Sequence, residues 1–171
     1  KTEPSLFYGS HNQETVLAEA AYYRFLFWSG MAMPPKQGYI TQHSIFSVNY
    51  SIKKGLKLQF EPFSSVSKIL TNPDSYQETQ TLGSDMRKAN IEGFEFTSAR
   101  DINAGVNVAL YSPKAFPPRQ AQRLKSKQEL ICETRGDVVV FSLENGKKTV
   151  VFKPKQVRFN KDYTKGCCKN L

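Results

Sequence analysis

The sequence of 171 residues is short of cysteine, histidine and acidic side chains. It has three Cys and two His, and 15 Asp plus Glu against 24 Lys plus Arg. Two of the three cysteines, Cys167 and Cys168, are adjacent, which does not make a disulfide framework and favours reduced thiols in a cytoplasm. His11 and His43 stand alone and there is no Cys-x-x-Cys motif, so we expect no metal cofactor.

Long hydrophobic runs are missing too. The longest apolar region, Val16 to Trp28, is interrupted by Glu19 and Arg24 and falls short of the roughly 18 apolar residues of a membrane helix. Residues 1–4 lack the basic-then-apolar order of a secretory signal. We therefore expect a soluble protein with no membrane contact. Because the chain has no initiator Met and enters an apolar run almost at once, we also expect it to be N-terminally truncated.

Common phosphate-binding and nucleophile motifs are absent. The sequence contains no Gly-x-x-x-x-Gly-Lys loop, no Gly-x-Gly-x-x-Gly fingerprint and no nucleophile elbow. A net charge of +9 nevertheless attracts phosphate-bearing partners, and the basic residues are densest between Lys114 and Lys169. That region leaves a nucleic-acid-binding module open as an alternative to an enzyme, and a plain solvated surface as the simpler explanation.

Hydrophobic periodicity predicts one α+β domain over residues 1–171, with few helices and many strands. One helix is expected over 12–28, opened by a capping box from Ser10 to Gln13, and another over 75–89, opened by a capping box from Ser75 to Glu78. Asn145-Gly146 predicts a type I′ hairpin. The expected strands are 5–9, 45–52, 56–60, 94–98, 106–111, 129–134, 138–143 and 149–153.

Glu19 is the most informative single residue. At 100° per residue it shares a helix face with Tyr23 and Leu26, and a carboxylate on an apolar face costs free energy unless it is paired or hydrogen-bonded. It either caps backbone groups or pairs with a distant Lys, or it lies in a dry cleft and stabilises a cation on a substrate.

Two further candidates lie near strand ends, where ligand-binding groups collect. The loop 98–105 follows one expected strand and precedes another; Ser98 could present its hydroxyl at the rim of the sheet, while Arg100 and Asp101 could form only a surface ion pair. Tyr8 ends the first expected strand, where its ring either offers a face to a planar ligand or belongs to the core.

In order along the chain, these segments resemble the RES family, named for its Arg, Glu and Ser. The resemblance rests on residues 6–10 and 14–19, on the helix–strand unit from Ser75, on 96–110, and on Ser112-Pro113-Lys114-Ala115-Phe116. It covers about 6–116, and the β-rich part at 120–160 is similar in kind. In the family, the Arg lies a short distance upstream of the Tyr, and the corresponding position would precede Lys1.

The resemblance implies an ADP-ribosyltransferase-like fold with mixed and antiparallel sheets, and NAD as substrate. It implies a toxin that degrades NAD or transfers ADP-ribose to a protein, with an antitoxin protein as partner; self-association is left open. Glu19 and Ser98 match the family Glu and Ser, and Tyr8 matches its pocket Tyr. In this interpretation Glu19 stabilises the ribosyl cation, Ser98 hydrogen-bonds ribose or phosphate, and Tyr8 and Arg100 contact NAD. An inactive interaction domain is the remaining alternative.

Overall fold

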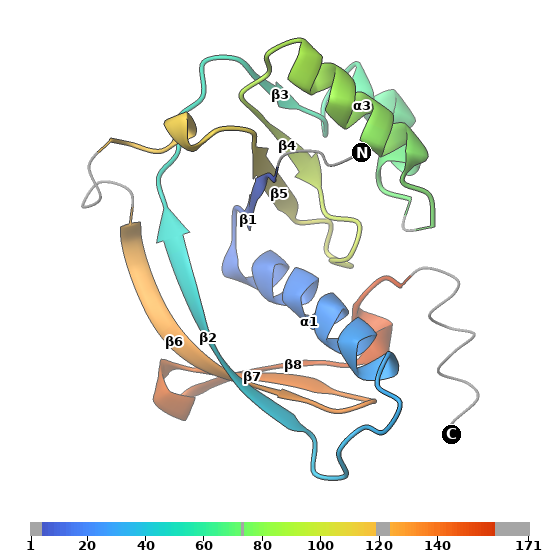
Figure 1. Cartoon of the computed structure of the whole chain (residues 1–171), viewed down its shortest axis with the longest axis vertical. Coiled ribbons are helices and arrows are strands. Elements are labelled where there is room, and N and C mark those ends of the chain that lie inside the picture. Colours follow the sequence, from blue (N-terminus) through green and yellow to red (C-terminus); the bar gives the residue numbers. More distant parts are fainter. Residues whose placement is uncertain (1–4, 73, 119–123, 160–171) are drawn as a thin grey trace.

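The computed structural model describes residues 5–72, 74–118 and 124–159. These residues form two four-stranded sheets and few helices, which confirms the α+β class expected from the periodicity. Sheet A has the order β1-β5-β4-β3, and sheet B has the order β2-β6-β7-β8. Figure 1 shows helix α1 between the two sheets, and α3 packs on the face of sheet A that carries Phe94 and Ala109.

Sheet A is built from short strands: β1 (Phe7–Ser10), β5 (Val106–Leu110), β4 (Gly93–Thr97) and β3 (Gly55–Lys57). The pairs β1–β5 and β5–β4 are antiparallel, and β3 runs parallel to β4. The 3₁₀ helix η1 (Phe63–Val66) and helices α2 (Ser67–Leu70) and α3 (Gln77–Lys88) accompany this sheet. Its core on that side contains Leu58, Met86, Ile91, Phe94 and Ala109.

Sheet B is antiparallel throughout and consists of β2 (Tyr39–Val48), β6 (Leu124–Thr134), β7 (Val139–Leu143) and β8 (Lys148–Phe152). Helix α1 (Gln13–Ser29) packs its apolar side chains against it. The shared core contains Leu17, Ala21, Tyr22, Phe25, Leu130, Cys132, Val139, Phe141, Leu143 and Val157. Short 3₁₀ helices η2 (Pro113–Ala115), η3 (Glu144–Gly146) and η4 (Pro154–Gln156) complete the chain.

Both predicted capping boxes are wrong. Asn12, not Ser10, caps α1, because its side chain accepts a hydrogen bond from the backbone of Thr15 at 2.8 Å. Ser10 is instead the last residue of β1. The N-cap residue of α3 is Tyr76, and its side chain makes no capping hydrogen bond. A Ser three residues before Gln or Glu therefore marked the neighbourhood of each helix start but not the capping residue.

The hairpin between β7 and β8 is confirmed in position but is wider than a two-residue turn. Leu143 pairs with Lys148, so four residues form the loop. Glu144, Asn145 and Gly146 all have positive φ. Strand β2 begins six residues before the expected strand at 45, because its polar residues lie on an exposed edge where no apolar alternation is needed. In the described ranges, no helix is long and apolar enough to cross a bilayer.

Candidate functional site

Glu19 and Ser98 are in direct contact although 79 residues separate them in the sequence. Ser98 lies immediately after β4, and its Oγ donates a hydrogen bond to Glu19 Oε1 at 2.6 Å. Glu19 lies in the second turn of α1, on the side that faces the end of sheet A. The two candidates that the sequence singled out therefore belong to one site.

Asn107 on β5 supplies the second hydrogen bond to the same carboxylate oxygen. Its Nδ2 donates to Glu19 Oε1 at 2.6 Å, and its Oδ1 accepts a hydrogen bond from Ser10 Oγ at 2.6 Å. A carboxylate only accepts and this hydroxyl donates, so the two partners fix the orientation of the amide. We call Glu19, Ser98, Asn107 and Ser10 the Glu19 network.

Only one oxygen of the Glu19 carboxylate is hydrogen-bonded to described residues. Both donors meet Oε1, while Oε2 has no hydrogen-bond partner among the described residues. Within the same part of the chain, Glu19 forms no ion pair with Lys, Arg or His. Two neutral donors thus hold the carboxylate in place without neutralising its charge, and one oxygen is left to meet a ligand.

Ser98 orients Glu19 and does not itself reach solvent. Its side chain is fully buried. Its Oγ also accepts the backbone N–H groups of Arg100 at 3.1 Å and Asp101 at 2.9 Å. With one proton given to Glu19 and two N–H groups accepted, the hydroxyl has no capacity left for a ligand. Direct contact with ribose or phosphate, as the resemblance implied, does not fit this geometry.

The loop that carries Ser98 is hydrogen-bonded to the first turn of α1. Asp101 Oδ2 accepts hydrogen bonds from Thr15 Oγ1 at 2.9 Å and from the backbone of Gly105 at 3.3 Å. A Cβ at Gly105 would lie 1.8 Å from Thr15 Oγ1, so only glycine permits this approach. The loop therefore fixes Ser98 relative to Glu19 through the helix that carries Glu19.

Arg100 lies inside the protein, with only 5% of its surface exposed. Its guanidinium stacks 3.8 Å from the centre of the Tyr22 ring, and it also donates to Arg158 O and to the hydroxyl of Tyr76. Asp101 is equally buried, so the alternative of a surface ion pair between the two residues is wrong. A direct contact between Arg100 and NAD stays a prediction.

Two exposed tyrosines, Tyr8 and Tyr23, lie near Glu19. Tyr8, on β1, projects from the same face of sheet A as Asn107, because Ser10 and Asn107 are directly paired and Tyr8 is two residues from Ser10. Its ring is 60% exposed and meets Phe96 edge-on at 6.4 Å. Tyr23, one turn after Glu19, is 62% exposed. Burial and the negative charge of Glu19 raise the pKa of Tyr23, so this phenol keeps its proton at neutral pH.

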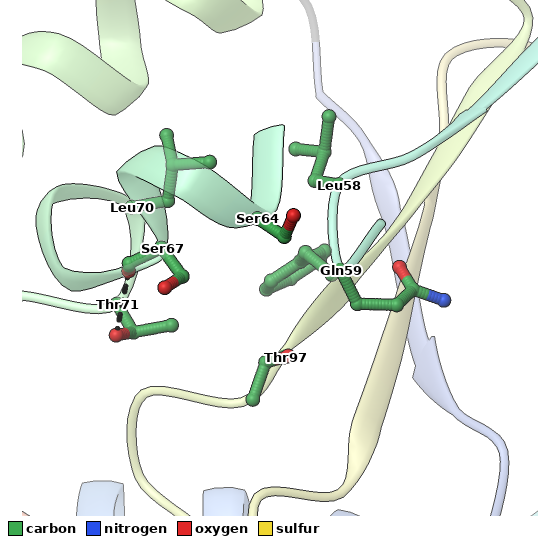
Figure 2. Close-up of a pocket in the computed structure, with 8 residues that line it drawn as sticks. Leu58, Gln59, Ser64, Ser67, Leu70, Thr71 and Thr97 are labelled. Atoms are coloured by element: carbon green, nitrogen blue, oxygen red, sulfur yellow. Dashed lines mark hydrogen bonds between the residues drawn. The ribbon is translucent and has the colours of Figure 1, made fainter. Parts of the chain in front are cut away.

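A cavity beside the end of β4 is too small for a dinucleotide. It measures about 140 Å³, below the roughly 300 Å³ at which small-molecule sites begin. Figure 2 shows it between Thr97 at the end of β4 and the hydroxyl groups of Ser64, Ser67 and Thr71. Glu19 and Ser98 do not line it. This cavity is therefore not where a ligand of Glu19 would bind.

Comparison with known families gives a match over most of the chain. The family model of the RES domain matches residues 1–130, which is three quarters of the chain. The chain belongs to the RES-domain family. No curated protein matches it.

The family match includes every member of the Glu19 network and ends within β6, so β7 and β8 lie beyond it. This RES domain thus carries its candidate site on sheet A and α1, inside the matched part. In the described part of the chain, no three His, Cys, Asp or Glu side chains are grouped to hold a metal ion.

Sequence reasoning missed Asn107 and Ser10. Asn107 occupies a polar position in the alternation of an apolar strand, which normally indicates a solvent-facing side chain. It is in fact 5% exposed and faces α1. The signal in the sequence was that β1 and β5 each have one polar residue, Ser10 and Asn107, at the ends that meet when the two strands pair.

Proposed function

We propose that this RES domain cleaves the nicotinamide–ribose bond of NAD and that the carboxylate of Glu19 acts on the reacting ribose. Membership of the RES family is consistent with a toxin-like, NAD-related domain. The observation that carries the proposal is the half-occupied carboxylate: Oε1 is fixed by Ser98 and Asn107, and Oε2 is unpaired among the described residues.

The chemistry requires a negative charge at the place where a positive charge develops. When the nicotinamide–ribose bond breaks, its electron pair leaves with nicotinamide, which becomes neutral, and the ribosyl carbon becomes oxocarbenium-like. Oε2 of Glu19 either faces this cation or accepts hydrogen bonds from the ribose hydroxyls. Since Ser98 and Asn107 already hold Oε1, the carboxylate needs no rearrangement during the reaction.

The other site residues have separate roles. Ser98, Asn107 and Ser10 are positioning residues that act through Glu19. Tyr8 and Tyr23 offer exposed rings and neutral phenols to the nicotinamide or the ribose. Arg100 lies behind Tyr76 and contributes positive potential on the side of the site where the pyrophosphate is expected.

The fold and the cellular role are part of the same proposal. Two mixed or antiparallel sheets with α1 between them suit an ADP-ribosyltransferase-like fold. The ADP-ribosyl cation is captured by water, by phosphate or by a protein side chain. Water, or a side-chain hydroxyl or amine, gives up one proton when the new bond forms, whereas an anionic oxygen of phosphate forms the bond without losing one. We further propose a toxin whose activity is held in check by an antitoxin protein partner.

Incubation of the full-length protein with NAD, followed by NMR of the products, tests this proposal. The expected products are free nicotinamide and either ADP-ribose or, when phosphate is supplied, its phosphorylated form. Consumption of NAD at the parent rate by the Glu19→Gln variant would refute the role of the carboxylate. Release of no nicotinamide by the parent, together with salt-sensitive binding of RNA or DNA, would favour the nucleic-acid module instead.

A further inference from the structure

One edge of sheet B is long and unprotected. β2 pairs only with β6 among the described strands, so its other edge is open along ten residues. Seven of its ten residues are exposed and none is fully buried. It contains no Lys, Arg, Asp, Glu or Pro, although 23% of the whole sequence is charged. Edge strands are normally protected by charge, proline or shortness.

The remaining sheet edges have the usual protection. β8, the opposite edge of sheet B, has five residues and is flanked by Lys147, Lys148 and Lys153. The edges of sheet A, β1 and β3, have four and three residues. The open edge of β2 is therefore a specific feature of one strand in the described part of the fold.

The outward-facing side chains of β2 are arranged symmetrically about His43. A β-bulge between Ser47 and Val48 ends the regular pairing with β6, so the regular stretch is Tyr39 to Ser47, with His43 at its centre. Residues of even number point away from α1, since the ring of Tyr39 lies under Arg24 of α1 and neighbours alternate. On that outer face the order is Ile40, Gln42, Ser44, Phe46: apolar, polar, polar, apolar.

We propose that β2 pairs with β2 of a second copy of this chain, antiparallel and centred on His43, so that the two B sheets form one sheet of eight strands. A two-fold axis perpendicular to the sheet keeps the outer faces of both copies on the same side. In this register Ile40 lies opposite Phe46 of the second copy, twice, and Gln42 lies opposite Ser44. The exposed apolar pair, 65% and 49% accessible in one chain, is thereby covered.

The self-complementary outer face favours a second copy as the occupant, because the same two-fold axis brings each Ile40 to the Phe46 of the other copy. The net charge of +9 on each chain opposes association, and a contact strand without Lys or Arg keeps this repulsion small at the interface. β2 is such a strand, and the nearest charges on β6 are paired internally: Lys127 with Glu129, and Glu133 with Arg135.

Two neighbouring registers would compete with this one. Centring the pairing on Gln42 places Phe46 opposite Gly38, and centring it on Ser44 places Phe46 opposite Gln42. Both registers lose the contact between Ile40 and Phe46.

Light scattering after size exclusion, on the full-length protein, tests the interface without measuring NAD. The parent is expected to be a dimer. Ile40→Lys and Phe46→Glu should each weaken the dimer at least ~30-fold by placing a charge against an apolar side chain. Both variants should stay folded, because Ile40 pairs with Glu133 and Phe46 with Lys127 on β6, where the new charge finds an opposite one.

The doubly substituted I40K/F46E chain should dimerise again, because this register sets each new ammonium opposite a new carboxylate. Ile131→Lys is the matched control: Ile131 is 45% exposed on the same face but one strand inward, and the dimer should persist. A monomeric parent, single variants that remain dimers, or a double variant that remains monomeric would each overturn the proposal. None of these outcomes depends on whether the protein cleaves NAD.

Discussion

One carboxylate lies against each face of sheet A, and the two carboxylates differ in their hydrogen bonds. On the face toward α1, Glu19 accepts two hydrogen bonds on one oxygen and makes no ion pair with a described residue. On the other face, Glu95 of β4 is occupied on both oxygens: Tyr50 at 3.2 Å on Oε1, and Gln59 at 3.1 Å on Oε2. The ammonium of Lys57 adds a positive charge at 3.4 Å, and the ring of His11 lies 3.6 Å from the carboxylate.

The difference separates a carboxylate whose two oxygens are both hydrogen-bonded from one with hydrogen bonds from described residues on a single oxygen. Burial alone would raise the pKa of Glu95, but its hydrogen bonds from Gln59 and Tyr50 and the nearby His11 and Lys57 outweigh burial and lower it. Burial and the charge of Glu95 raise the pKa of Tyr50 to about 12. Glu95 is thus a saturated structural group, whereas the unpaired oxygen of Glu19 leaves capacity for a substrate.

The largest expected contrast comes from removing each charge in turn. Glu19→Gln should lower kcat for NAD cleavage by about 10²–10³, the range found when a group that stabilises transition-state charge is removed. Glu95→Gln is the matched control on the opposite face and should change kcat less than about threefold. Steady-state release of nicotinamide measures both. Equal losses in the two variants would mean that the faces of sheet A do not differ in function.

A smaller effect is expected from Asn107→Leu, which removes one of the two donors to Glu19 Oε1. We expect kcat to fall about tenfold, with KM within about threefold of the parent, because the donor positions Glu19 and does not touch NAD. Asn103→Ala, in the exposed part of the neighbouring loop, is the control and should leave both constants unchanged. A rise in KM at constant kcat would instead place Asn107 in direct contact with the substrate.

Tyr8→Ala should raise KM for NAD about tenfold, since stacking of an aromatic side chain on a planar base contributes roughly 1–3 kcal/mol. Tyr8→Phe keeps the ring and removes only the hydroxyl, so its KM should stay near that of the parent. Equal KM values for Tyr8→Ala and the parent would remove Tyr8 from the binding surface.

The smallest effect concerns stability on the Glu95 face. The folded-state pKa of Glu95 is below its unfolded value, so its contribution is fully present above the unfolded pKa of about 4.3 and is lost as pH falls through the folded pKa. Glu95→Gln should therefore unfold more easily by about 1 kcal/mol at pH 7. The difference in the free energy of unfolding between parent and variant, measured by urea unfolding, should become smaller below about pH 4. A difference independent of pH would show that the charge of Glu95 does not contribute.

The sequence alone determined the two longer helices and most strands, and it singled out Glu19 as a candidate. A continuous apolar helix with one Glu on its buried side can be recognised from periodicity, because burying an unpaired carboxylate costs free energy wherever it occurs. The ordered motifs also sufficed for the RES family, which the family comparison confirms over residues 1–130. The class of two sheets with few helices followed from the same local patterns.

Only the tertiary structure decided what each polar side chain does. The pairing of β1 with β5 brings Ser10 to Asn107, and the packing of α1 over the end of sheet A brings both Asn107 and Ser98 to Glu19. Ser98 thereby becomes a buried positioning group, and Arg100 a buried cation under Tyr22. Contacts across 79 or 88 residues leave no mark in local periodicity, because they depend on strand register and helix packing.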